Sequence, residues 1–84
     1  MNTEDTKSAP HNATLRKPYL TRPESSEFLE ENGFPCPKGT LQKLASVGGG
    51  PVYRIFGNKA LYTPDDLLAW AHARLSEPRL STSA

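Results

Sequence analysis

Three segments of the 84-residue chain space their apolar residues as one face of an amphipathic helix. They cover residues 22–31, 37–47 and 64–75, and charged or small polar residues occupy their other faces. The apolar positions predicted to face the core are Phe28 and Leu29 in the first segment, Leu41, Leu44 and Ala45 in the second, and Leu67, Trp70, Ala71 and Leu75 in the third. Trp70 is expected to be the largest side chain of this core.

Local signals indicate where these helices begin. Thr21 and Glu24 form a capping box, in which the hydroxyl accepts from an orphan amide and the carboxylate accepts from the amide of the cap residue. Thr63 and Asp66 repeat the signal before the third helix. Pro37 suits the first position of the second helix, where its missing amide costs nothing.

A glycine-rich turn and two short strands separate the second helix from the third. Residues 48–50 are all glycine and end the helix, and strands are predicted over 52–56 and 60–62. Gly57-Asn58-Lys59 between the strands has the composition of a hairpin turn. The order helix, helix, hairpin, helix predicts a small α+β fold, a winged helix-turn-helix with three helices and a two-stranded hairpin as its wing.

The predicted hairpin region carries three aromatic residues, Tyr53, Phe56 and Tyr62. They could stack on nucleic-acid bases, but in so small a domain they more often pack in the core or along the hairpin. The strand register is not fixed by the sequence, so which of the three face inward stays open.

Composition sets the limits of the domain. Residues 1–17 and 76–84 are polar and lack apolar periodicity, so they are predicted to be disordered tails around a domain at 18–75. Cys36 is the only cysteine and cannot form an internal disulfide, and no secretory or membrane-length apolar run occurs. We therefore expect a soluble, cytoplasmic protein without a membrane partner, and a small semi-buried role for Cys36.

Charge is distributed unevenly, although the formal net charge is only +1. Between Gly33 and Pro64 the chain has no acidic residue, whereas acidic residues cluster in the first helix. A basic helix followed by a basic hairpin suits a DNA duplex, because the helix fills the major groove and the hairpin reaches the neighbouring backbone. Charge alone would describe ordinary solvated surfaces equally well; the order of the elements favours DNA.

The second helix presents a polar face away from its apolar stripe. Gly39, Lys43 and Ser46 project outward, and Gln42 lies on the flank. Lys38 at the helix start is well placed for a phosphate. Gly39 weakens the helix by up to roughly 1 kcal/mol relative to alanine. Two explanations for a glycine here are equally plausible: close approach to a DNA backbone, or a chance substitution at a tolerant surface position.

Other chemistry has little support in the sequence. The glycine run at 48–50 is not followed by the Lys-Ser/Thr of a phosphate-binding loop, so nucleotide binding is not expected. No Cys/His set suggests a metal, and no carboxylate and base are paired for catalysis. We expect a protein that is not an enzyme and has no cofactor.

Several motifs resemble the excisionase and AlpA-type family of small winged helix-turn-helix proteins, which are related to the MerR DNA-binding domain. The similarity covers about residues 19–75 and departs from the usual pattern at Gly39 and at the wing tip, where Asn58-Lys59 replaces two basic residues. The matching positions are Leu20-Thr21, Thr40-Leu41, Gly50-Pro51, Tyr62 and Asp66-Leu67 with Trp70.

The resemblance implies a recombination directionality factor of an integrative and conjugative element. Such a protein binds repeated attachment sites on double-stranded DNA, often side by side, and bends or wraps the DNA so that a separate site-specific integrase excises the element. The acidic first helix and the basic wing are complementary in charge, and we expect head-to-tail self-association through them. The residues expected to serve it are Lys38, Gly39, Thr40, Gln42, Lys43 and Ser46 in the recognition helix, Arg54, Asn58 and Lys59 in the wing, Thr21 and Arg22 at the first helix start, and Glu27 and Glu30 for self-association. The alternatives are a conventional transcriptional regulator with this fold and a protein-interaction adaptor.

Overall fold

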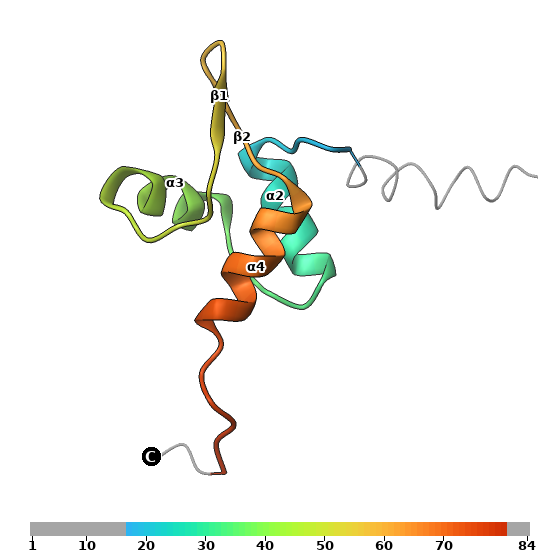
Figure 1. Ribbon diagram of the computed structural model, residues 1–84, viewed down its shortest axis with the longest axis vertical. Coiled ribbons are helices and arrows are strands. Elements are labelled where there is room, and N and C mark those ends of the chain that lie inside the picture. The colour runs from blue at the N-terminus through green and yellow to red at the C-terminus, as the bar shows by residue number, and fades with distance from the viewer. Residues whose placement is uncertain (1–16, 81–84) are drawn as a thin grey trace, which may run out of the picture.

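The computed structural model describes residues 17–80, which form three helices and one antiparallel two-stranded hairpin (Figure 1). The elements are α2 (Arg22–Glu31), α3 (Lys38–Val47), β1 (Arg54–Phe56), β2 (Lys59–Leu61) and α4 (Pro64–Arg74). This order confirms the predicted α+β class. The predicted N-terminal tail lies outside the described residues except for Lys17, and residues 81–84 of the C-terminal tail lie outside them as well.

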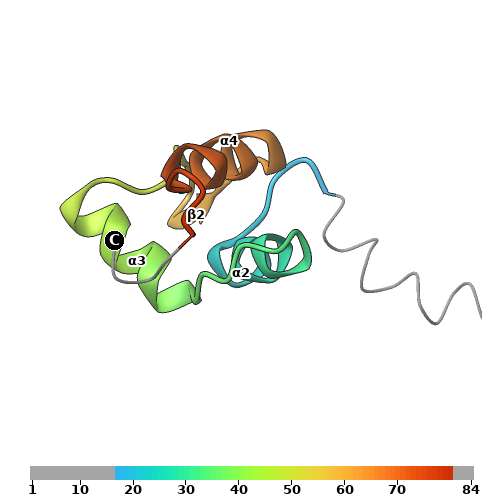
Figure 2. The ribbon, with the colours of Figure 1, turned by 90° about the horizontal axis from the view of Figure 1, so that it is seen from below.

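The hairpin projects from the helices as an arm, with α3 on one side of it and α2 on the other (Figure 1). α2 packs against both α3 and α4. Seen from below, α3 lies well to the side of α4 (Figure 2). α3 is therefore held mainly by α2 and by its two connecting segments.

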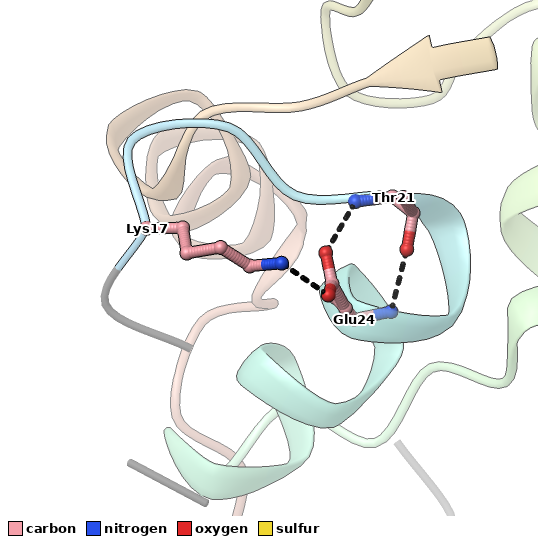
Figure 3. Close-up of polar contacts among 3 residues, drawn as sticks. All are labelled: Lys17, Thr21 and Glu24. Carbon is pink, nitrogen blue, oxygen red and sulfur yellow. Dashed lines mark hydrogen bonds and ion pairs between the residues drawn. The ribbon is translucent and has the colours of Figure 1, made fainter. Parts of the chain in front are cut away.

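The capping box at the start of α2 forms as predicted (Figure 3). The Thr21 amide donates to Glu24 Oε1 at 3.0 Å, and the Glu24 amide donates to Thr21 Oγ1 at 3.4 Å. Lys17 Nζ donates to Glu24 Oε2 at 2.7 Å. The bond from Lys17, followed by the one from the Thr21 amide, holds the pKa of the Glu24 carboxyl below its ordinary value.

α3 begins one residue later than predicted. Pro37 is the extended residue that precedes the helix (φ −60°, ψ 153°), not its first helical residue, and its carbonyl accepts from Thr40 and Leu41. The other end is as expected. Gly48 and Gly49 have φ of 99° and 95°, a left-handed region that side chains other than glycine rarely adopt.

The hairpin turn has two residues, not the predicted three. Phe56 pairs with Lys59, so Gly57 and Asn58 form the turn, and Gly57 takes the positive φ (65°) that tight hairpin turns require. β1 is also shorter than predicted. Tyr62 leaves the hairpin ladder and forms a separate antiparallel bridge with Leu20.

The buried apolar core draws on every helix and on the foot of the hairpin. Its members are Leu20, Leu29, Cys36, Leu41, Tyr62, Leu67 and Ala71. Phe28, Leu44 and Ala45 are only half-buried. Two expectations were wrong: Tyr62, not Trp70, is the largest fully buried side chain, and Leu75 is 61% exposed because α4 ends at Arg74 and the chain turns extended there.

Removing the Glu24 carboxylate should destabilise the fold in a pH-dependent way. Glu24→Gln keeps an oxygen that can accept from the Thr21 amide but removes the charge that faces Lys17 and the positive end of the helix dipole, so it should lower the free energy of unfolding at neutral pH by about 0.5 kcal/mol. The folded-state pKa lies below the unfolded one, so this contribution is complete above the unfolded pKa and disappears as pH falls through the folded value. Urea unfolding of both proteins at neutral and acidic pH should show the difference narrowing with acid; a constant difference would contradict the ionic role.

Candidate nucleic-acid interface

The outward face of α3 is polar and open to solvent. Lys38, Gly39, Thr40, Gln42, Lys43 and Ser46 are all exposed. Leu41 beneath them is fully buried, so the helix is oriented as its apolar spacing predicted. A Cβ added at Gly39 would meet nothing within 4 Å, so packing inside the protein does not require glycine at this position. These six residues therefore present a solvent-accessible polar surface on α3.

A polar clasp from α4 fixes the turn that follows α3. Trp70 Nε1 donates to the Gly49 carbonyl at 2.8 Å, and Arg74 Nη1 reaches the same oxygen at 3.5 Å. The Arg74 guanidinium lies 5.1 Å from the Trp70 ring centroid. The turn is tight, because a Cβ at Gly50 would fall 2.9 Å from the Leu44 Cβ. The clasp therefore ties α4 to the turn that joins α3 to the hairpin.

The hairpin carries the predicted basic side chains, but one of them has an acidic neighbour. Arg54 Nη1 lies 4.0 Å from Asp66 Oδ2; the Arg54 side chain is largely solvated, and the Asp66 side chain is partly buried. The chain has no acidic residue between Gly33 and Pro64, so the sequence does not indicate this neighbour, which approaches from α4 across the fold. Asn58 and Lys59 are exposed at the tip, and Lys59 has no ion-pair partner among residues 17–80.

The three aromatic residues of the hairpin region divide between core and surface. Tyr62 is 1% exposed and belongs to the core, whereas Phe56 near the tip is 75% exposed. Tyr53 is exposed at the foot of the hairpin, with its ring centroid 5.7 Å from that of Tyr62. Of these three aromatic residues, Tyr62 alone packs in the core.

The predicted residues at the start of α2 have different roles. The Thr21 hydroxyl is occupied by the capping box. Arg22 is half-buried, and its Nε donates to the Tyr62 hydroxyl at 3.0 Å. The bridge between Leu20 and Tyr62 brings this helix start to the foot of the hairpin. Sequence spacing gave no sign of the contact, which joins residues 40 positions apart.

Negative charge gathers on α2, away from the basic elements. Glu27 and Glu30 are exposed and line a shallow depression with Ser26 and Glu31. α2 lies on one side of the hairpin and α3 on the other (Figure 1). The domain therefore has an acidic surface on α2 and a basic one on α3 and the hairpin.

A second hollow, between α3 and the end of α4, contains no reactive group. Phe34, Cys36, Leu44 and Trp70 are among its lining residues. Burial raises the pKa of the Cys36 thiol, and the Arg74 charge opposes this only in part. The thiol is thus protonated at neutral pH and a poor nucleophile. Within residues 17–80, no three His, Cys, Asp or Glu side chains converge as a metal site would require.

No helix within residues 17–80 is long and apolar enough to cross a membrane.

Comparison with known proteins gave no family: no protein-family model matches the sequence, and no curated protein is significantly similar to it. The residues of α3 and the hairpin, and their geometry, therefore carry the functional inference.

Removing the indole donor of Trp70 should loosen the turn after α3. Trp70→Phe keeps an aromatic ring but leaves the Gly49 carbonyl without its shortest bond, so stability should fall by about 1 kcal/mol. Hydrogen exchange should rise at the Gly48 amide, which closes the end of α3 on Leu44. Urea unfolding and exchange measured by NMR check the two effects. Unchanged exchange at Gly48 would show that the clasp does not hold the turn.

Proposed function

We propose that the protein binds double-stranded DNA as a winged helix-turn-helix, with α2 and α3 as the helix-turn-helix and the β1–β2 hairpin as the wing. The observation that carries this proposal is the exposed polar face of α3 beside a projecting basic hairpin. α3 enters the major groove, where Gln42 and Lys43 meet base edges or adjacent phosphates. Lys59 and Arg54 meet the neighbouring backbone.

The biological role that this proposal favours is that of a recombination directionality factor. The resemblance of the Leu20-Thr21, Thr40-Leu41 and Gly50-Pro51 motifs to excisionases supports it. In that role the protein organises attachment-site DNA so that a separate integrase excises a mobile element. The alternative is a transcriptional regulator of neighbouring genes with the same fold. Excision that proceeds unchanged in the absence of the protein would favour this alternative.

A domain of this size makes too few DNA contacts to bind a single site both tightly and selectively. It makes on the order of six phosphate contacts, which is too few for tight solitary binding at physiological salt. Neighbouring copies on tandem sites compensate for this, because a shared DNA scaffold raises their effective concentration. The acidic surface of α2 and the basic hairpin are complementary, so head-to-tail contact between copies follows from the separation of charge described above.

The helix and the wing should contribute differently to binding. Gln42→Ala with Lys43→Ala should weaken binding by about 1–3 kcal/mol on the preferred sequence, because a base contact is lost. Lys59→Ala should weaken binding equally on all duplexes and lower the salt slope by about one unit. Arg54→Ala should have a smaller effect, since Asp66 already faces that charge. Electrophoretic or fluorescence titrations on attachment-site and scrambled duplexes measure both effects.

Arg79→Ala is the control for those titrations, because Arg79 is exposed and lies beyond α4. It removes one positive charge without touching α3 or the hairpin. If wild-type protein fails to bind either duplex, an adaptor role replaces DNA binding. If the Gln42 and Lys43 double variant binds like wild type, α3 is not the recognition helix.

Self-association should appear on DNA and be weak without it. Exposed ion pairs contribute roughly 0–1 kcal/mol each, so the free protein should be monomeric. A duplex with several tandem sites should be bound more tightly and more steeply than a duplex with one. Glu30→Lys should flatten the first curve, whereas Glu77→Lys changes the net charge equally outside α2 and should not. Equal affinity per site on both duplexes, measured by titration, would contradict cooperative assembly.

A further inference from the structure

The Arg22 side chain is held at the foot of the hairpin by two tyrosines. Its Nε donates to the Tyr62 hydroxyl at 3.0 Å, and its guanidinium carbon lies 5.5 Å from the centroid of the Tyr53 ring. The two rings lie 5.7 Å apart. One tyrosine thus supplies a hydrogen bond and the other a π-face to the same cation.

Both ends of the Arg22 side chain are fixed. Its backbone follows Thr21, whose capping box sets the start of α2. The Tyr62 hydroxyl belongs to a buried residue whose backbone exchanges two hydrogen bonds with Leu20, at 2.7 Å and 2.8 Å. The guanidinium therefore has a preferred position before any partner arrives, and less rotamer freedom is lost on binding.

The terminal nitrogens of Arg22 have no hydrogen-bond or ion-pair partner among residues 17–80. Two acidic groups, one on α2 and one on α4, are engaged elsewhere: Glu24 with Lys17 and Thr21, and Asp66 with Arg54. A cation at a helix start also opposes the helix dipole. The guanidinium is held in place while its terminal N–H groups stay available, and these groups can donate in parallel to two oxygens of one anion.

We propose that Tyr62 and Tyr53 position Arg22 to clamp a backbone phosphate of the bound duplex at the foot of the wing. The inference rests on the proposed DNA-binding function and adds one fixed contact to it. Arg22 touches the phosphate, and the two tyrosines act through Arg22 as positioning residues. DNA is favoured over an acidic protein because Lys59 and Arg54 extend the same positive charge along the hairpin.

A double-mutant cycle on a fluorescently labelled mixed-sequence duplex tests this arrangement. Arg22→Gln should weaken binding roughly tenfold and lower the salt slope by about one unit, as expected for one charge-assisted phosphate contact. Tyr62→Phe should weaken binding roughly threefold, the effect of one modest hydrogen bond. In the Arg22→Gln background, Tyr62→Phe should cause no further loss. Arg22→Lys should recover the salt slope without recovering the affinity.

Two controls keep the outcome clear. Arg79→Gln removes a charge beyond α4 and should leave the slope unchanged. Tyr53→Leu changes an exposed residue outside the core, and its loss of affinity should also vanish in the Arg22→Gln background, so the cycle can be completed even if Tyr62→Phe unfolds. Thermal unfolding verifies that each variant is folded.

The results separate this inference from the function on which it rests. An unchanged slope for Arg22→Gln, with normal salt-dependent binding by wild type, overturns the phosphate clamp and leaves DNA binding intact. Additive losses for Arg22→Gln and the tyrosine variants overturn the positioning role. Absence of salt-dependent binding by the wild type removes the proposed function itself, and an acidic protein then becomes the partner that fits the open guanidinium.

Discussion

The backbone bridge between Leu20 and Tyr62 joins the segment before α2 to the end of the hairpin. It places one large side chain, Tyr62, at 1% exposure among residues from all three helices. Because Tyr62 directly follows β2 and directly precedes the Thr63 cap of α4, the position of this residue sets both the base of the hairpin and the start of the last helix. An isolated two-stranded hairpin is marginal in water, and this bridge supplies the support it lacks.

α3 is attached to this framework differently. It packs against α2 through Leu41 and is limited at its far end by left-handed glycines and by the Trp70 bond to Gly49. The Trp70 ring lies at the edge of the core, where its indole nitrogen reaches the Gly49 carbonyl, and it is not the buried centre that its size suggested. A helix held mainly along one face and at its ends can expose its whole polar side, as the role proposed for α3 requires.

The sequence predicted the features that local chemistry determines. The bounds of α2 and the end of α3 follow from Thr21, Glu24 and the glycine run, each acting within a few residues. Features that depend on distant residues were missed: the approach of Asp66 to Arg54, and the anchoring of Arg22 by Tyr62. The turn was predicted one residue too long because strand register is decided by pairing across the hairpin, not by turn composition.

The basic side chains of α2, α3 and the hairpin differ in how far their conformations are restrained. The small core explains this difference. A domain with so few buried residues cannot fix many long charged side chains, and freezing each one costs conformational entropy. Lys43 and Lys59 are exposed, and in the proposed complex their side chains adapt to different DNA conformations. In the proposed complex, Arg22 alone arrives anchored, by residues that also hold the hairpin. On this proposal, one fixed contact beside several adaptable ones sets the register of the domain on the duplex, while the lysines supply salt-dependent affinity.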